Sequence, residues 1–286
     1  MGTIAQRAEA LLDTAVAATT PLAGGDVCTA TRLRLSTGSS ALVKTRPHAP
    51  ADFFRTEAAG LRWLAEVPGV DTPDVLAVED DCLILSWVEG GRPDVEAAER
   101  LGRSLAGLHA AGAEAFGAGP AGTDGYIGTL PLRNRPVPSW PEFWATQRLL
   151  PYLKVARDRG AVSPADAAAV ESVVRRLVAL AGPDEPPARL HGDLWSGNLI
   201  WGHDARVWLI DPAAHGGHRE SDLAMLSLFG CPQLPRVLDA YQEISPLADG
   251  WEDRVALHQL FPLLVHACMF GGGYGARAGA AARSLA

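Results

Sequence analysis

Two patterns of hydrophobic and polar positions divide the chain. In about the first 90 residues, short apolar stretches alternate with polar positions and are separated by turn residues, which predicts strands. From Val95 onward, apolar residues recur every three or four positions, which predicts helices. We therefore expect an α+β protein with two lobes: a β-rich N-terminal lobe over residues 1–90 and a mainly helical C-terminal lobe over residues 91–286, joined by a glycine hinge.

The N-terminal pattern predicts a five-strand sheet with one inserted helix. A short amphipathic helix over 3–18 precedes it, and a glycine turn at 24–26 is expected to join two strands within 21–35. Asp52 is a plausible N-cap for the inserted helix. The other predicted segments are a strand at 41–46, the inserted helix at 52–67, and a strand pair at 75–78 and 82–88.

The C-terminal pattern predicts a series of helices, with two loops rich in proline or glycine at 117–138 and 183–189. Two short apolar runs, at 199–201 and 207–210, interrupt the helical pattern. The predicted helices cover 95–112, 139–159, 163–182, 219–229, 234–243 and 251–270.

Composition narrows the class of protein. The 286 residues are 48% hydrophobic, enough for a sizeable core, and a net charge of −8 without a basic run argues against nucleic acid as a partner. No apolar run reaches the roughly 18 residues of a membrane helix, and the N-terminus lacks a secretory signal. The four cysteines form no C-x-x-C pair, which argues against structural zinc. We expect a cytoplasmic protein without a membrane partner, and favour a monomer.

One motif carries the chemistry of phosphoryl transfer. His191 is followed by Asp193 and Asn198 in the spacing H-x-D-x-x-x-x-N, and Asp211 ends a later apolar run. A kinase needs an acceptor for the hydroxyl proton, which Asp193 would supply. It also needs hard oxygen ligands for magnesium, which Asn198 and Asp211 would supply. An ordinary polar turn before a buried strand is the alternative.

Features ahead of this motif stand in the order that a kinase requires. Gly24 and Gly25 would let backbone amides approach phosphates, Lys44 ends an apolar strand, and Glu57 on the next helix would pair with it. Taken singly, they fit equally well a hairpin turn, a solvated lysine and a surface glutamate. Backbone groups of Ser86 and Val88, in the segment LSWVE at 85–89, would meet the adenine edge of ATP.

Several longer segments resemble the fructosamine kinase (ketosamine-3-kinase) family, which is similar in fold to aminoglycoside phosphotransferases and protein kinases. The segment LHGDLWSGN at 190–198 is similar to the family's catalytic loop, and DGYIGTLP at 124–131 to its NYIGSLP segment. Further matches are IDPA at 210–213, GHRESDLAM at 217–225 and FGGGY at 270–274. The resemblance runs from about Pro21 to Tyr274.

The resemblance implies an ATP- and Mg²⁺-dependent kinase that phosphorylates free or protein-bound ketosamines at the sugar 3-hydroxyl, a deglycation step. Asp193 would be the base, Asn198 and Asp211 the magnesium ligands, and Lys44 with Glu57 the phosphate-positioning pair. The chain departs from the family at one point: members often have a cysteine directly after the glycine pair. Here Asp26 stands there and Cys28 follows two residues later, which weighs against a redox role for the loop.

Contacts with the acceptor are less defined by the sequence. Trp195 would stack on a sugar ring or pack in the core. His218 and its neighbours through Asp222 would order the C-terminal lobe as an ion-pair cluster or face the substrate. Tyr274 follows three glycines, and its role is open. His109, on an apolar helix face, is expected to be a hydrogen-bonded core residue.

Two other functions remain open at this stage. One is a kinase for another small hydroxyl compound, such as an aminoglycoside or a choline-like alcohol; an aminoglycoside pocket should be strongly acidic, and the net charge permits that. The other is an ATP-binding pseudokinase that acts as a scaffold. The presence of Lys44, Asp193, Asn198 and Asp211 together argues against the scaffold.

Overall fold

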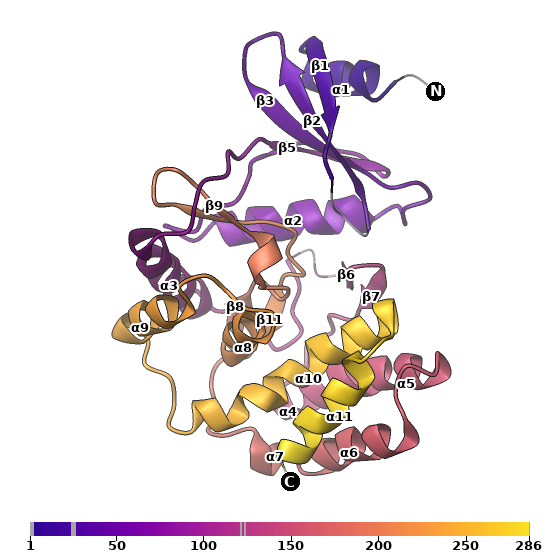
Figure 1. Cartoon of the computed structure of the whole chain (residues 1–286), viewed down its shortest axis with the longest axis vertical. Coiled ribbons are helices and arrows are strands. Elements are labelled where there is room, and N and C mark those ends of the chain that lie inside the picture. The colour runs from indigo at the N-terminus through magenta and orange to yellow at the C-terminus, as the bar shows by residue number, and fades with distance from the viewer. Residues whose placement is uncertain (1–2, 24–26, 121, 123, 286) are drawn as a thin grey trace.

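The computed structural model describes residues 3–23, 27–120, 122 and 124–285. At the top of Figure 1, an antiparallel sheet of five strands forms the N-terminal part, in the order β1-β2-β3-β5-β4. The predicted α+β architecture, a sheet followed by helices, is confirmed. The sheet consists of β1 (Val16–Pro21), β2 (Thr29–Leu35), β3 (Ser40–Thr45), β4 (Val75–Val78) and β5 (Cys82–Ser86).

The two faces of this sheet are covered by different helices. Helix α1 (Ile4–Leu12) packs on one face with Val43 and Ile84, and helix α2 (Phe53–Ala65) packs on the other with Leu83 and Leu85. Successive side chains of a strand point to opposite faces, so one strand contributes side chains to the contacts with both helices. Lys44 pairs with Leu83 in the sheet and therefore lies on the α2 face.

Two N-terminal predictions were wrong in detail. The helix predicted over 3–18 ends at Leu12, because Asp13 adopts a left-handed backbone (φ 48°), and β1 occupies the rest of that segment. Asp52 stands at the start of α2 but its side chain caps no helical amide. Its carboxylate instead accepts a hydrogen bond from the Tyr126 hydroxyl at 2.6 Å. The predicted turn at 24–26 lies outside the described residues.

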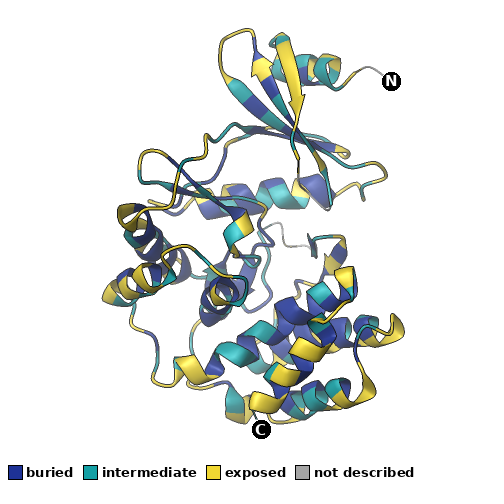
Figure 2. Ribbon diagram, viewed as in Figure 1, coloured by how far each residue is buried: buried dark blue, intermediate teal, exposed yellow. Residues whose placement is uncertain are grey.

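Helices dominate the remainder of the chain and turn buried faces, dark blue in Figure 2, toward its interior. The buried apolar residues of this part form two clusters. Asp94 and Ser163 cap their helices through side-chain oxygens, as helix starts favour. The elements are α3 (Val95–Ala110), α4 (Trp140–Phe143), the π-helical turn η1 (Trp144–Leu149), α5 (Leu150–Asp158), α6 (Pro164–Arg175), α7 (Leu177–Leu180), α8 (Glu220–Leu228), α9 (Leu234–Ile244), α10 (Trp251–Phe270) and α11 (Tyr274–Ser284).

The helix predicted over 139–159 is instead three segments, with η1 between α4 and α5. Pro151 explains the break, because a proline has no N–H to donate to the carbonyl of Gln147, four residues earlier. A π-helical turn before a proline accommodates that loss. Helix α11 was not predicted, since residues 274–284 are mostly alanine and glycine and carry little periodic signal.

Three short strand pairs position the loops between the helices. These are β6 (Gly125–Ile127) with β7 (Leu130–Leu132), β8 (Ala188–Leu190) with β11 (His215–Gly217), and β9 (Leu199–Trp201) with β10 (Val207–Leu209). The apolar runs at 199–201 and 207–210 correspond to β9 and β10, whereas the other four strands were not predicted, because three-residue strands leave almost no alternation to detect. No helix in the described part of the chain is long and apolar enough to cross a membrane.

Candidate active site

A cavity of about 570 Å³ lies beneath the α2 face of the sheet and reaches the helical part of the chain. Its walls come from both parts. The sheet side contributes Leu42, Lys44 and Leu85, while Asp193 and Asp211 enter from loops of the helical part. A concave site with few convergent polar groups is the usual form of a small-molecule site.

Lys44 joins the two parts through a buried network. Its ammonium donates to Glu57 Oε1 at 2.6 Å and to Asp211 Oδ1 at 3.0 Å. Burial opposes the charged form, but the adjacent carboxylates outweigh it and raise the pKa of Lys44. The structure thus holds a permanent cation between helix α2 and the loop after β10, where it can meet phosphate oxygens.

His191 connects the catalytic loop to the segment before Asp211. Its Nε2 lies 2.9 Å from the carbonyl oxygen of Ile210, and its Nδ1 lies 3.2 Å from the backbone N–H of Asp193. These partners require one tautomer, in which Nε2–H donates and Nδ1 accepts. Burial lowers the pKa of His191, which keeps the ring neutral and both bonds in place.

Asp222 holds the backbone of the same loop. Its carboxylate accepts the backbone N–H groups of His191 at 2.8 Å and Gly192 at 2.9 Å, and it lies 3.3 Å from His109 Nε2. Burial alone would raise the pKa of Asp222, but these hydrogen bonds outweigh it and lower it. His109 also contacts the Tyr241 hydroxyl at 2.9 Å, which confirms it as a hydrogen-bonded core histidine.

The Asp193 carboxylate lines the cavity and is set for proton transfer. Burial raises its pKa to about 7, helped by the charges of Asp211 and Asp222 and opposed by a hydrogen bond from Asn198. That bond joins Asn198 Nδ2 to Asp193 Oδ2 at 3.0 Å. A base works best when its pKa is close to the operating pH, so this carboxylate suits a hydroxyl donor at neutrality.

Asn198 and Asp211 are the residues that fit a magnesium ion. Asn198 donates both of its Nδ2 bonds to Asp193, which leaves Oδ1 available as a ligand, and Ile210 N–H to Asn198 O at 3.1 Å brings the two segments together. Asp211 stands in the left-handed region at φ 54° and keeps its second carboxylate oxygen beside the one that contacts Lys44. Carboxylate and amide oxygens are the ligands that Mg²⁺ prefers.

The predicted adenine-binding residues Ser86 and Val88 both line the cavity, with Trp87 between them. The N–H of Ser86 is already donated to Asp74 O at 2.9 Å, while the N–H of Val88 has no partner in the described chain. The guanidinium of Arg32 lies 4.2 Å from the centre of the Trp87 ring and supports it from outside. Val88 is therefore the better backbone donor for a base edge.

The predicted phosphate-binding glycines Gly24 and Gly25 lie outside the described residues. The residues on either side of them, Ala23 and Val27, line the cavity, as does Cys28. Burial raises the pKa of the Cys28 thiol to about 11. All four cysteines are free thiols, and Cys28 at neutral pH is protonated and weakly reactive.

The three predicted acceptor contacts fall in different places. Trp195 lines the cavity with 36% of its surface exposed, which excludes core packing, and its ring lies over Gly197 and against the edge of Phe229. Tyr274 does not line the cavity but packs behind His266, at 5.0 Å between ring centres. His218 is buried elsewhere.

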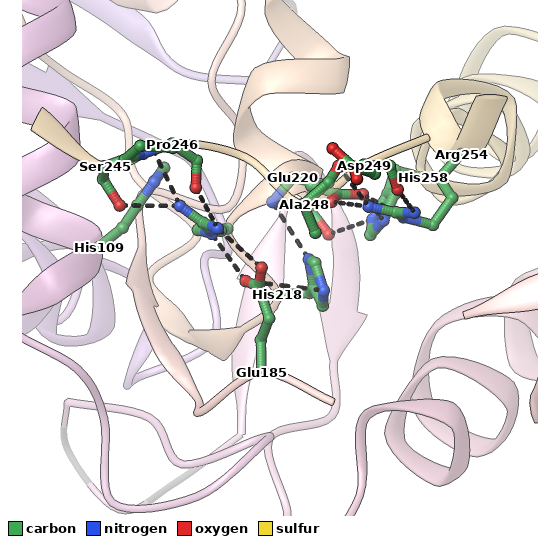
Figure 3. A network of polar contacts seen from close by, with 12 residues as sticks. His109, Glu185, His218, Glu220, Ser245, Pro246, Ala248, Asp249, Arg254 and His258 are labelled. Carbon is green, nitrogen blue, oxygen red and sulfur yellow. Dashed lines mark hydrogen bonds and ion pairs between the residues drawn. The ribbon is translucent and has the colours of Figure 1, made fainter. Parts of the chain in front are cut away.

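Figure 3 shows the network that holds His218. Arg219 donates to both Glu185 carboxylate oxygens at 2.7 Å, and Arg254 donates to both Glu220 oxygens at 2.9 and 2.6 Å. The ion-pair interpretation of this segment is therefore the correct one. His218, Glu220 and His258 lie close enough for a shared metal ion, but the Arg254 guanidinium already neutralises Glu220.

Among the cavity residues that the sequence analysis did not single out are Asn134 and His266, while Phe270 was named only as part of the segment FGGGY. Asn134 follows a loop without any recognisable motif, and the other two belong to an apolar helix that reads as core. Asp222 was grouped with the ion pairs, although it holds the catalytic loop. The one available signal was its position within the family-like segment GHRESDLAM at 217–225.

The five-stranded sheet, the Lys44–Glu57 pair and the loop carboxylates of Asp193 and Asp211 occur together. This combination defines a phosphotransferase of the protein-kinase-like fold. The fold is shared with an aminoglycoside phosphotransferase solved as a gentamicin complex, at 14% identity and a TM-score of 0.64, covering 100% of this chain and 95% of that one. The family model for fructosamine kinase matches residues 1–285, and the chain belongs to that family.

Individual relatives agree with this assignment. A probable ketoamine kinase of Enterococcus faecium is 34% identical over 262 residues, which cover 90% of this chain and 91% of the relative. The solved structure of a putative fructosamine-3-kinase from Thermobifida fusca is 49% identical, with a TM-score of 0.93 and coverage of 99% of this chain and 98% of that one.

Proposed function

We propose that this enzyme uses ATP and Mg²⁺ to phosphorylate ketosamines at the sugar 3-hydroxyl, as a step of protein deglycation. The observation that carries the proposal is the Asp193 carboxylate, which faces the cavity with a pKa of about 7 beside the Lys44 network. Membership of the fructosamine kinase family, with relatives named ketoamine kinases, supports the choice of acceptor.

The chain's own residues suffice to describe the transfer. Val88 and Ser86 border the space for adenine, and Lys44 would pair with phosphate oxygens while Glu57 fixes its position. The acceptor hydroxyl would donate its proton to Asp193 as its oxygen attacks the terminal phosphorus, and the bond from that phosphorus to the bridging oxygen of ATP would break, so that ADP leaves. Asn198 and Asp211 would hold the magnesium ion, which neutralises phosphate charge when bound.

The charge of the cavity favours a weakly charged sugar over an aminoglycoside. Among the described lining residues, the carboxylates are Glu57, Asp193 and Asp211, and each already has a role in the phosphate site. A polycationic acceptor would need further acidic groups to match its charges. The rim instead presents Trp195 and Phe270, whose apolar faces suit the C–H side of a sugar ring.

An acceptor panel tests the proposal. Purified protein with ATP and Mg²⁺ would be given fructosyl-lysine, ribulosyl-lysine, a glycated lysine peptide, kanamycin and choline, and product would be located by phosphorus and carbon NMR. We expect turnover of the ketosamines with phosphate on C3, and loss of the sugar from the peptide in mass spectra. Turnover of kanamycin or choline without ketosamine turnover would refute the proposed acceptor.

A further inference from the structure

A buried polar clamp holds one segment of the cavity wall. Arg148, fully buried in the π-helical turn η1, donates to the carbonyl of Arg133 at 2.6 Å and to Oδ1 of Asn134 at 2.8 Å. Its neighbour Gln147 accepts the N–H of Arg135 at 2.9 Å and donates to the carbonyl of the same residue at 2.7 Å. Two adjacent side chains thus fix three consecutive residues.

The clamp also fixes which way the Asn134 amide points. A guanidinium has only donors, so the amide oxygen must face Arg148 and the amide nitrogen must face away. Asn134 is buried but lines the cavity, and its Nδ2 has no hydrogen-bond partner in the parts of the chain that the structure describes. A Cβ at Gly125 would lie 3.5 Å from this nitrogen, so the glycine leaves the space in front of it open.

The electrostatics of Arg148 do not by themselves favour its burial. Burial lowers the pKa of Arg148 to about 10, and no carboxylate of the described residues forms an ion pair with it. Its guanidinium instead lies 4.3 Å from the centre of the Phe143 ring and donates to the carbonyl oxygen of Arg133. A buried charge without an ion partner is unfavourable. What the clamp achieves is to fix the direction of the two N–H groups on Asn134 Nδ2.

Asn134 lines the cavity where the β6–β7 hairpin meets helix α2. A Cβ at Gly125, the glycine next to its amide, would lie 3.2 Å from Thr56 Cγ2, and Thr56 directly precedes Glu57, the partner of Lys44. The same β6–β7 hairpin reaches Val27 through Gly128. A Cβ at Gly128 would also lie 2.5 Å from Met269, the neighbour of Phe270 at the rim, so this wall of the cavity borders the side where we place the acceptor.

We propose that Asn134 determines acceptor specificity by donating its Nδ2–H groups to oxygens of the acceptor sugar, and that Arg148 is the positioning residue that directs this amide. The inference rests on the proposed function in that the acceptor is taken to be a ketosamine. Sugar hydroxyl and carbonyl oxygens accept hydrogen bonds, whereas an ammonium group, which has only donors, would gain nothing from this amide.

Asn134→Asp is the sharpest test because the new carboxylate still accepts from Arg148 but cannot donate. With fructosyl-lysine as the probe, we expect the acceptor KM to rise by about 10- to 100-fold, since a buried sugar oxygen loses its donor. The KM for ATP should change less than about twofold. Gly125→Ala, which fills the space before Nδ2, should raise the acceptor KM in the same way.

Arg148→Lys separates positioning from mere support. It keeps the positive charge but loses the paired donors, so we expect the acceptor KM to rise while the thermal midpoint falls only slightly. A fall in thermal midpoint with an unchanged acceptor KM would refute the positioning role. An increase in the KM for ATP in Asn134→Asp, with the acceptor KM unchanged, would place the amide on the phosphates and overturn the proposal.

Different measurements would refute the proposed function and the proposed role of Asn134. Turnover of fructosyl-lysine by the wild-type enzyme tests the proposed function, whereas the ratio of the two KM values between variant and wild type tests Asn134. Should the wild type phosphorylate kanamycin and no ketosamine, the proposed function is refuted, and the same comparison with kanamycin then decides whether Asn134 binds the acceptor.

Discussion

At the scale of single residues, Asp193 owes its reactivity to two opposed influences. Burial and the nearby charges of Asp211 and Asp222 raise its pKa to about 7, while the Asn198 amide stabilises the charged form. The result is a carboxylate that is substantially ionised at neutral pH and still basic enough to accept a proton. A fully solvated aspartate, with a pKa near 4, would be a weaker base.

Replacement of Asp193 by asparagine should abolish this function without disturbing the loop. An asparagine keeps an oxygen that accepts from Asn198, so we expect kcat to fall by about 10²- to 10⁴-fold and nucleotide affinity to change little. Steady-state kinetics and calorimetric titration with ADP and Mg²⁺ check the two parts. Activity close to the wild-type level would exclude Asp193 as the base.

At the scale of elements, helix α3 and helix α9 approach each other at a glycine. A Cβ on Gly102 would lie 2.2 Å from the carbonyl oxygen of Val237 and 2.9 Å from the N–H of Tyr241, so no side chain fits there. Gly107 lies on the same helix, and a Cβ there would meet nothing within 4 Å. The approach matters for the site because Tyr241 contacts His109, which supports Asp222.

The two glycines predict opposite effects of the same substitution. Gly102→Ala should destabilise the protein by about 1–3 kcal/mol through overpacking, because the backbone of α9 must move. Gly107→Ala should stabilise it by about 0.5–1 kcal/mol, because alanine favours the helix. Urea unfolding of both variants measures the difference, and equal effects would contradict the close approach of α3 and α9.

At the scale of the whole molecule, buried neutral histidines link folding to pH. Burial lowers the pKa of His215 and His218 to about 3, far below the 6.5 of an exposed histidine. Between these values the unfolded chain binds protons that the folded chain does not, so stability increases with pH. The contribution is complete above pH 6.5 and is lost as the pH falls toward 3.

This linkage predicts early acid destabilisation. A change from pH 6.5 to pH 5 should remove about 2 kcal/mol of unfolding free energy for each of these two histidines, at about 1.4 kcal/mol per pH unit. Protonation of Asp193, whose pKa is raised to about 7 in the folded chain, has the opposite sign and offsets about one of the two, so a net loss of about 2 kcal/mol is expected. Glu220 works in the same direction only at lower pH, because Arg254 and His258 overcome burial and lower its pKa to about 2. Urea midpoints at pH 7, 6 and 5 measure the trend, and equal midpoints would contradict it.

Much of the catalytic centre could be predicted from the sequence, because its residues sit in short motifs of fixed spacing. Asp193 and Asn198 share one loop, and the structure brings Lys44, Glu57 and Asp211 to them. The fold class followed from periodicity, since strands and helices of five or more residues leave a clear pattern. Strands β6, β7, β8 and β11 have three residues each and leave none, and β9 and β10, which are equally short, were marked only by their apolar runs.

The sequence by itself determined the class of chemistry, the order of sheet and helices, and the identity of the groups that we propose to handle protons and phosphate. Only the tertiary structure decided which other residues face the acceptor. Asn134 is directed by Arg148, and His218 is drawn away by a buried ion-pair cluster. The physical reason is that a motif records local spacing, whereas the direction of a side chain depends on partners that folding brings from distant elements.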